Sequence, residues 1–308
     1  MNPRAEAQGK VGDAYDARVL APSPPAVAAG PWFADDPVAR DGATRPVVSP
    51  VSSGDVAWAE LAADDPALAA WCRERWLGPY PALAAAPDGY ADTRVALHAV
   101  AEHVLAPARR HANGKIGLRH VRGGFGTPFF GDGAQVSVRG TALHVVRAGA
   151  GSSHALTSLA AAAAALGDLA APGAELSGDP LALDDGAAAV VCAWFGFAYS
   201  VLEELRARAN EELAPSRVQI WPEHFDAAVE LGSEADGRRA GYGCSPGDEL
   251  HPEPYCYVTP WTEQPAGELW NARGFAGAEL SYAELLGAGD PGALALAFFA
   301  QRLRALTA

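Results

Sequence analysis

Residues capable of acid–base chemistry or metal binding crowd into one stretch of the chain, between Arg217 and Trp270. They include the carboxylates and imidazoles of Glu223, His224, Asp226, Asp248, Glu249, His251 and Glu253. His224 and Asp226 are two residues apart, so on an extended strand their side chains point the same way. The set His224, Asp226 and His251 could hold a divalent metal ion, and Glu223 with His224 could act as acid and base. Neither spacing is specific, because an acidic loop between strands uses the same residue types.

Aromatic residues in the same stretch suggest a binding site instead. Trp221, Tyr255 and Trp261 stand at or beside the ends of predicted strands. One interpretation is an aromatic-lined pocket between the sheet and a long helix over residues 185 to 208. The other is that these are ordinary core aromatics with a polar tip at the rim.

A glycine-rich run from Gly123 to Gly133 carries Phe125, Phe129 and Phe130 and follows a predicted strand that begins with Lys115. It matches neither the dinucleotide-binding nor the phosphate-loop pattern, so it indicates no nucleotide site. We expect either a loop that closes over an apolar or aromatic ligand, or a connection whose phenylalanines fill the core.

Two apparent catalytic motifs fail on geometry. Gly243 to Gly247 matches the Gly-x-Ser-x-Gly pattern of serine hydrolases, but the residue after Ser245 is Pro246, which has no N–H for an oxyanion hole. A tight turn is expected there. His98 and His103 are five residues apart, about 140° around a helix, so they cannot bind one ion. An exposed helix face with a contact between His98 and Glu102 is expected instead.

Composition limits the classes of partner. The chain has 308 residues and a formal charge of −14, so a nucleic-acid partner is disfavoured because phosphate binding needs clustered cations. The amino terminus lacks an apolar leader, which predicts a cytoplasmic protein. The uncharged run Gly186 to Leu202 is shorter than the ~20 apolar residues of a membrane span, so a buried helix and no membrane partner are expected. The four cysteines form no Cys-x-x-Cys pair and are expected to be small, reduced core residues.

Hydrophobic patterning predicts an α+β fold with largely antiparallel sheet and packed helices. Residues 1–54 should be an extended, partly disordered Pro-rich segment and 55–112 a helical segment, in which a helix from about Thr93 is ended or kinked by Pro107. Residues 113–308 should form the body, as two strands-then-helix units over 113–175 and 180–308; whether they are a duplication stays open. Strands are expected at 115–121, 135–139, 143–147, 218–221, 227–231, 239–244 and 255–259, and helices at 156–166, 185–208 and after Asp290-Pro291.

Five landmarks in this order resemble a bacterial, actinobacterial-type domain family of unknown function. They are Asn113-Gly-Lys-Ile-Gly-Leu118, Val201-Leu-Glu-Glu-Leu-Arg206, Trp221-Pro-Glu-His-Phe-Asp-Ala-Ala-Val229, Pro252-Glu-Pro-Tyr255 and Leu280-Ser-Tyr-Ala-Glu-Leu285 before Asp290-Pro291. The resemblance covers about residues 113–308. It implies a folded unit and no particular mechanism or catalytic residue.

The leading functional hypothesis is a domain that binds a small molecule or a protein partner, because two aromatic regions are present and no catalytic set is complete. The alternative is a metal-assisted hydrolase that uses His224, Asp226 and His251. No cofactor is indicated by a motif, and a divalent metal belongs only to that alternative.

Overall fold

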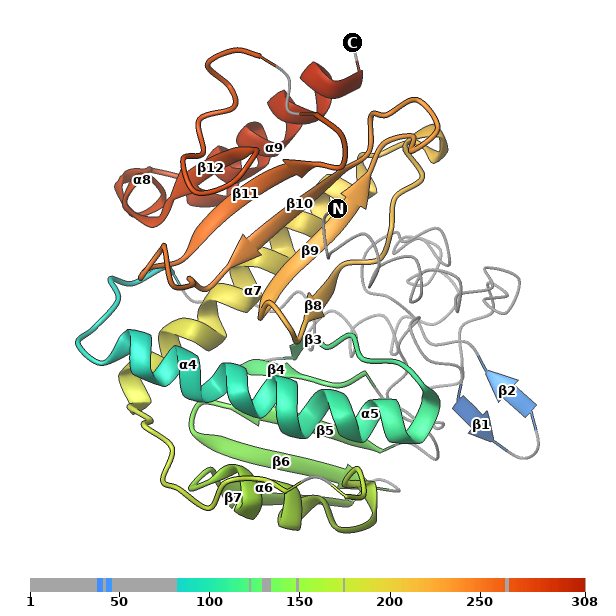
Figure 1. Ribbon diagram of the computed structural model, residues 1–308, viewed down its shortest axis with the longest axis vertical. Coiled ribbons are helices and arrows are strands. Elements are labelled where there is room, and N and C mark those ends of the chain that lie inside the picture. Colours follow the sequence, from blue (N-terminus) through green and yellow to red (C-terminus); the bar gives the residue numbers. More distant parts are fainter. Residues whose placement is uncertain are drawn as a thin grey trace.

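The computed structural model describes residues 82–121, 123–128, 134–147, 150–173, 175–263 and 266–307, together with the short strand pair β1 (Val38–Arg40) and β2 (Ala43–Arg45). The fold is α+β, as predicted, with two antiparallel sheets of five strands each (Figure 1). The remaining predictions for residues 1–81, the extended segment and the first part of the helical segment, lie outside the described residues.

The first helix does not end at Pro107, one of the two alternatives predicted there, but its regular winding is interrupted just before it. Helix α4 (Tyr90–Val100) passes through a π-helical turn (Ala101–Leu105) into α5 (Ala106–Asn113), which has Pro107 in its first turn. Proline lacks a main-chain N–H and disrupts the regular helical hydrogen-bond ladder, and a π-helical turn is one way to absorb such a disruption. The helix therefore continues past Pro107 and ends at Gly114, whose φ of 78° is left-handed.

The first sheet is a meander of five strands in chain order. Its strands are β3 (Arg119–Val121), β4 (Gly124–Gly126), β5 (Gln135–Arg139), β6 (Ala142–Arg147) and β7 (Ala150–Ala155). The hairpin predicted around Gly140 is confirmed, and Gly140 has the positive φ that such a turn requires. Strands β4 and β7 were not predicted, because Gly, Ser and Ala carry little strand preference. Helix α6 (Leu159–Leu166) and a 3₁₀ turn (Gly167–Leu169) follow.

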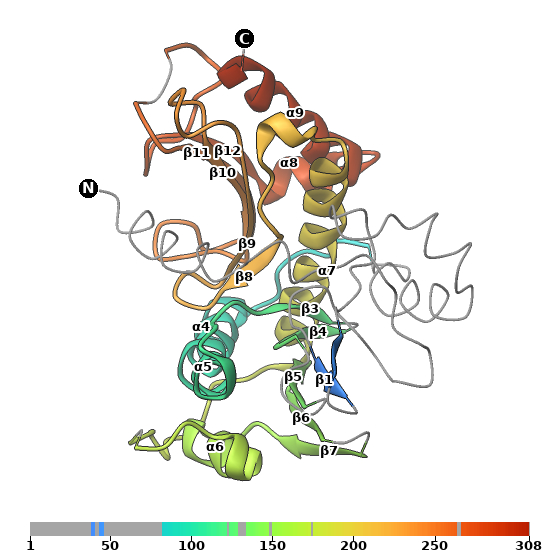
Figure 2. The same cartoon turned by 90° about the vertical axis from the view of Figure 1, so that its right-hand side faces the viewer.

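Helix α7 (Asp185–Ala207) confirms the long helix predicted at 185–208 and contacts strands of both sheets (Figure 2). The side chain of Asp184 accepts a hydrogen bond from the N–H of Ala187 and caps its start. Within the described part of the chain, α7 is the one helix long and apolar enough to cross a membrane. Because 72% of the most apolar 18-residue stretch of α7 is buried inside the protein, α7 is better explained as a core helix.

The second sheet is also a meander in chain order. After the 3₁₀ turn Glu211–Leu213 come β8 (Gln219–Trp221), β9 (Asp226–Leu231), β10 (Ala240–Ser245), β11 (Tyr255–Pro260) and β12 (Ala278–Ser281), then α8 (Tyr282–Gly287) and α9 (Pro291–Thr307). The two sheets meet where Leu118 and Ile220 exchange two main-chain hydrogen bonds of 2.8 Å. Each unit thus consists of a helix, five strands and following helices, which extends the predicted strands-then-helix order by one leading helix.

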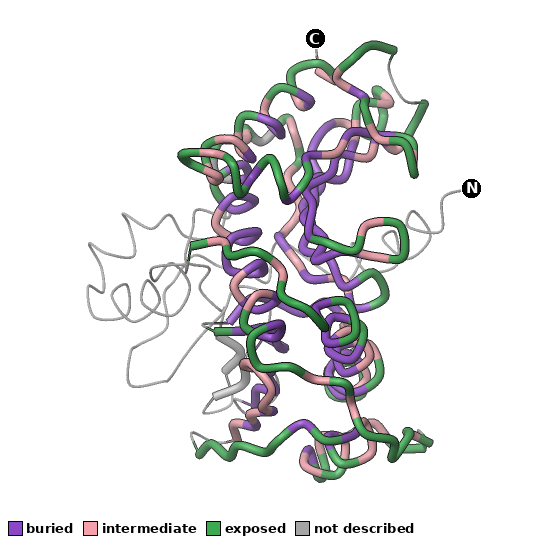
Figure 3. Tube along the Cα trace, turned by 90° about the vertical axis from the view of Figure 1, so that its left-hand side faces the viewer, coloured by how far each residue is buried: buried purple, intermediate pink, exposed green. Residues whose placement is uncertain are grey.

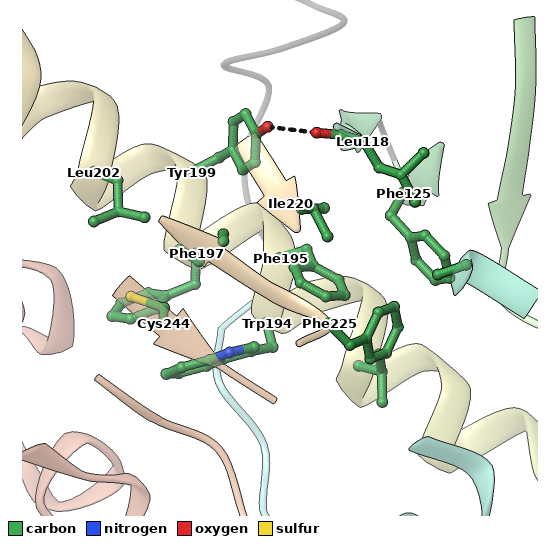
Figure 4. Close-up of a cluster of buried hydrophobic side chains, with 14 of the residues drawn as sticks. Leu118, Phe125, Trp194, Phe195, Phe197, Tyr199, Leu202, Ile220, Phe225 and Cys244 are labelled. Carbon is green, nitrogen blue, oxygen red and sulfur yellow. Dashed lines mark hydrogen bonds between the residues drawn. The ribbon is translucent and has the colours of Figure 1, made fainter. Parts of the chain in front are cut away.

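The core lies between α7 and the strands that face it, as the purple segments of Figure 3 show. Phe125, Phe195 and Phe225 meet edge to face or tilted, with ring centroids 5.0 to 5.5 Å apart (Figure 4). Phe225 has a left-handed φ of 53°, a strained conformation for a large side chain, and its N–H donates to the main-chain oxygen of Trp221 at 2.7 Å while its ring is buried in this cluster. Phe125 is fully buried in this cluster and fills the core, which is the second of the two roles expected for the phenylalanines of residues 123–133.

Candidate functional site

The second sheet has two different faces. Tyr242, Cys244, Cys256 and Val258 point into the core, where the Tyr242 ring packs on Phe299 of α9 at 6.1 Å. Successive side chains of a strand alternate between the faces, so Tyr255, Tyr257 and Thr259 of β11 lie on the face opposite the core. In Figure 2, α7, α8 and α9 all lie on the core side of this sheet. The opposite face is the outer face.

Two glycines in β10 shape the outer face. Gly243 lies directly opposite Tyr257, and a Cβ at residue 243 would overlap the tyrosine ring. The missing side chain therefore allows the ring of Tyr257 to lie across β10. Its hydroxyl then donates a hydrogen bond to the carboxylate of Asp226 on β9, one strand further away. This pair is buried and links three strands across the outer face.

A second polar network lies beside Tyr257 and is centred on His251. The two ring nitrogens of His251 face carboxylates on opposite sides, Asp248 Oδ1 at 3.1 Å from Nδ1 and Glu279 Oε2 at 3.1 Å from Nε2. The hydroxyl of Tyr255 donates to Asp248 Oδ2 at 2.6 Å, and the Tyr255 ring stacks on the imidazole at 4.1 Å. The imidazole is therefore held at both ring nitrogens and on one ring face.

Asp248 is stabilised as a carboxylate. Partial burial alone would raise the pKa of Asp248, but hydrogen bonds outweigh that effect and hold its pKa below the usual value. The donors are the Tyr255 hydroxyl, the main-chain N–H groups of His251 and Leu250, and the His251 ring. Asp248 therefore stays negatively charged at neutral pH.

Glu279 is positioned from the edge of the sheet. It belongs to β12, the last strand of the second sheet, and the side chain of Asn271 donates to the Glu279 main-chain oxygen and accepts from its N–H, both at 3.0 Å. The amide of Asn271 thus replaces a neighbouring strand at this position. It fixes the main chain that carries the Glu279 carboxylate towards His251.

Part of this network, namely Asp248, His251, Tyr255 and Tyr257, lines a groove of about 530 Å³ on the outer face. Asp248 and His251 contribute polar groups, and the aromatic walls are Tyr255, Tyr257, Trp261 and Phe275. The Trp261 ring is supported by the guanidinium of Arg239, 5.2 Å from its centre, and Arg239 is in turn 3.4 Å from the carboxylate of Glu230. The groove is also lined by Leu250, which is 70% exposed, by the short loop at Gly274 to Ala276, and by Thr259, Pro260 and Thr262.

The structure does not bring the predicted metal ligands together. His224 and Glu223 are exposed in the turn before β9, Asp226 binds Tyr257, and His251 lies between Asp248 and Glu279. In the described ranges no group of three His, Cys, Asp or Glu side chains could hold a metal ion. The expectation that His224 and Asp226 point the same way was wrong, because residues 222–225 form a turn rather than a strand.

The predicted ligand-binding residues divide into three groups. Tyr255 and Trp261 line a groove, but this groove lies on the outer face and not between the sheet and α7, where the aromatic pocket was expected. Trp221 is half-buried on β8 and Lys115 follows the end of α5, and neither lines the groove. Phe129 and Phe130 lie outside the described residues. The expected loop over 123–133 is in part strand β4, which pairs with β3 and β5.

Glu279 and Phe275 are site residues that the sequence did not indicate. They follow His251 by 28 and 24 residues, and only the pairing of β11 with β12 brings them back to it. The one local signal is the alternation Ala278-Glu-Leu-Ser281, with buried residues at Ala278 and Leu280 and Glu279 between them.

Ser245 behaves as the sequence analysis expects. It is 3% exposed, and its hydroxyl accepts a hydrogen bond from the N–H of Gly247 at 3.1 Å. The residue therefore shapes the turn after β10. This geometry is that of a turn residue rather than of an exposed nucleophile.

Comparison of this chain with protein-family models, with curated proteins and with solved structures finds no match. The site is therefore interpreted from its own geometry.

Proposed function

We propose that this protein binds a small organic molecule in the outer-face groove, with a flat apolar part of the ligand against the aromatic walls and a hydrogen-bond donor at Asp248. The observation that carries the proposal is the groove itself, about 530 Å³, in which four aromatic residues lie beside the polar side chains of Asp248, His251, Thr259 and Thr262. This volume lies within the range of roughly 300 to 1,000 Å³ that is typical of small-molecule sites.

The polar network supports binding because it leaves Asp248 both charged and accessible. The side chain of Asp248 is 40% exposed, and its Oδ2 atom accepts from the Tyr255 hydroxyl at 2.6 Å, while His251 Nδ1 lies closer to Oδ1 (3.1 Å) than to Oδ2 (3.4 Å). A carboxylate oxygen has two lone pairs, so Oδ2 can accept a further hydrogen bond from a ligand. The bonds within the network hold the acceptor in place before the ligand arrives, which lowers the entropic cost of binding.

The aromatic walls favour a ligand with a ring. Tyr257 and Tyr255 form the floor, and Trp261 and Phe275 are half-buried at the rim. Aromatic pairs contribute about 0.5 to 1.5 kcal/mol beyond the area they bury, so two rim rings can supply much of the affinity for a small ligand. Tryptamine, which joins a flat bicyclic ring to an ammonium group, matches both features and is a suitable probe.

The test is the affinity of tryptamine for the full chain, measured by calorimetry. Replacing Trp261 by Ala removes a groove wall, and the expected result is an affinity about tenfold lower, the equivalent of about 1.4 kcal/mol. The matched control is Trp221→Ala, which removes a half-buried tryptophan outside the groove and should change the affinity by less than about twofold. Equal losses in the two variants, or no binding to the unaltered protein, would contradict the proposal.

A further inference from the structure

One face of α4 makes hydrogen bonds to two loops of the second unit. Tyr90, Arg94 and His98 are four residues apart, so they lie along one side of the helix. The Tyr90 hydroxyl donates to the main-chain oxygen of Pro246 at 2.7 Å, and His98 Nε2 is 2.9 Å from that of Pro222. The expected contact between His98 and Glu102 is present at 3.7 Å, but the His98 ring also stacks on Phe225.

Arg94 makes the contact closest to the groove. Its Nη1 atom donates to the main-chain oxygen of Gly247 at 2.9 Å and its Nη2 atom to that of Asp248 at 3.2 Å. The residue is only 8% exposed, and a buried guanidinium is costly unless it makes strong hydrogen bonds. Hydrogen bonds from a charged donor are stronger than those between neutral groups, so these two fix the main chain at residues 247 and 248 firmly.

The loop between Ser245 and His251 is held from inside as well. The N–H of Asp248 donates to the main-chain oxygen of His251 at 2.8 Å, and the Asp248 carboxylate accepts from the N–H of His251 at 2.8 Å. Gly247 has a φ of 111°, and a Cβ there would lie 2.7 Å from the main-chain oxygen of His251. The loop is thus held by bonds of its own and by the second sheet, and α4 adds three side-chain hydrogen bonds at Pro246, Gly247 and Asp248.

We propose that α4 positions the groove: Tyr90 and Arg94, from the first unit, hold the 246–251 loop in the place where Asp248 and His251 can receive the ligand, and Arg94 is the main positioning residue. The ligand part of this inference rests on the proposed function. The claim that Tyr90 and Arg94 hold the loop does not rest on the proposed function, because it concerns only the position of the loop. A site on the second unit is then complete only when the first unit is docked against it.

Tyr90 acts as a donor over the whole working pH range. Burial, aided by the nearby hydroxyl of Tyr282, raises the pKa of Tyr90, so its hydroxyl keeps its proton and remains bonded to Pro246. The substitution Tyr90→Phe keeps the ring packing and removes only the hydrogen bond to Pro246, one of those that Tyr90 and Arg94 make to the 246–251 loop.

The test is amide hydrogen exchange of the full chain with Arg94→Met, which keeps much of the apolar stem and removes the guanidinium. The expected result is exchange about tenfold faster or more at the amides of Asp248 and His251, because two hydrogen bonds from a charged donor are lost, with wild-type rates in α7. Arg110→Met, an exposed arginine further along the same helical segment, is the matched control and should leave both regions unchanged. If Arg94→Met does not fold, Tyr90→Phe gives the same comparison with a smaller increase.

A second measurement on the same variants separates positioning from general stability. Arg94→Met should weaken tryptamine binding about fivefold or more, whereas Arg110→Met should leave it within about twofold. Unchanged exchange at Asp248 and His251 would overturn the inference, and faster exchange with unchanged tryptamine affinity would overturn the role of α4 in ligand binding. If the unaltered protein does not bind tryptamine, the proposed function fails, and the exchange rates still decide whether α4 holds the loop.

Discussion

Gly243 provides a direct test of how the outer face is built. In Gly243→Ala the new Cβ would occupy the space of the Tyr257 ring, and the ring cannot move away without giving up its hydrogen bond to Asp226. Gly243 needs no positive φ, so alanine is acceptable to the main chain and the effect comes from the side-chain overlap alone. The substitution therefore isolates one contact.

The magnitude follows from two contributions. Overpacking a well-filled site costs about 1 to 3 kcal/mol. Loss of a buried hydrogen bond to a charged group costs a further ~1.5 to 3 kcal/mol. The free energy of unfolding of Gly243→Ala should therefore fall by about 2.5 to 6 kcal/mol, measured by urea denaturation.

A matched control lies on the same strand and the same face. At Gly241 a Cβ would be 3.9 Å from Glu230 and 4.0 Å from Thr259, which is ordinary contact, so Gly241→Ala should be close to neutral. In a Tyr257→Val background the overlap disappears, and Gly243→Ala should then cost little, giving a coupling energy of about 2 kcal/mol or more. Equal costs for the two glycine variants, or an unchanged cost in the Tyr257→Val background, would refute the reasoning.

Two further predictions concern stability. Burial lowers the pKa of His120 from 6.5 to about 3, although the hydrogen bond with Gly124 opposes this shift. The folded state therefore keeps this imidazole neutral. The contribution of His120 to the free energy of unfolding is complete above pH 6.5 and is lost as the pH falls towards 3. Between pH 8 and pH 5, the free energy of unfolding from denaturant titrations should fall by about 2 kcal/mol more in the unaltered protein than in His120→Gln. The exposed control His224→Gln should behave like the unaltered protein. An equal fall in His120→Gln and His224→Gln would contradict this prediction. Trp194 is fully buried and packs on Phe197 at 5.3 Å and Tyr282 at 5.6 Å, so Trp194→Ala should lower the free energy of unfolding by about 3 to 5 kcal/mol. A loss under about 1 kcal/mol in urea denaturation would mean that this face of α7 is not core.

The sequence was most informative where local patterns decide the structure. The apolar run from Asp185 predicted α7 almost to the residue, and the apolar positions beside Gly140 predicted the β5–β6 hairpin. Strands β4 and β7 escaped notice because Gly124–Gly126 and Ala150–Ala155 have few strand-forming residues and owe their structure to their neighbours. These strands form because neighbouring strands pair with them, and local sequence patterns do not predict such pairing.

The candidate site shows the same division. The crowding of Asp248, His251 and Tyr255 within one short loop and the following strand indicated a site, and these residues do meet. The grouping of His224 with Asp226 failed because it assumed an extended chain, whereas the left-handed Phe225 closes a turn between them. The contacts of Asp226 with Tyr257 and of His251 with Glu279 depend on strand register, which residue spacing alone does not fix.

The most direct test of the central claim is to observe which residues a ligand touches. The chain has eight tryptophans, so an NMR titration of the full protein labelled with ¹⁵N at the indole nitrogens follows each of them as tryptamine is added. Trp261 lines the groove, and its signal should shift progressively with the same midpoint as the calorimetric titration. The signals of Trp221, half-buried on β8, and of Trp194, buried beside α8, should stay in place. Shifts at Trp221 or Trp194 with a stationary Trp261 signal would place the ligand elsewhere and contradict the assignment of the groove as the binding site.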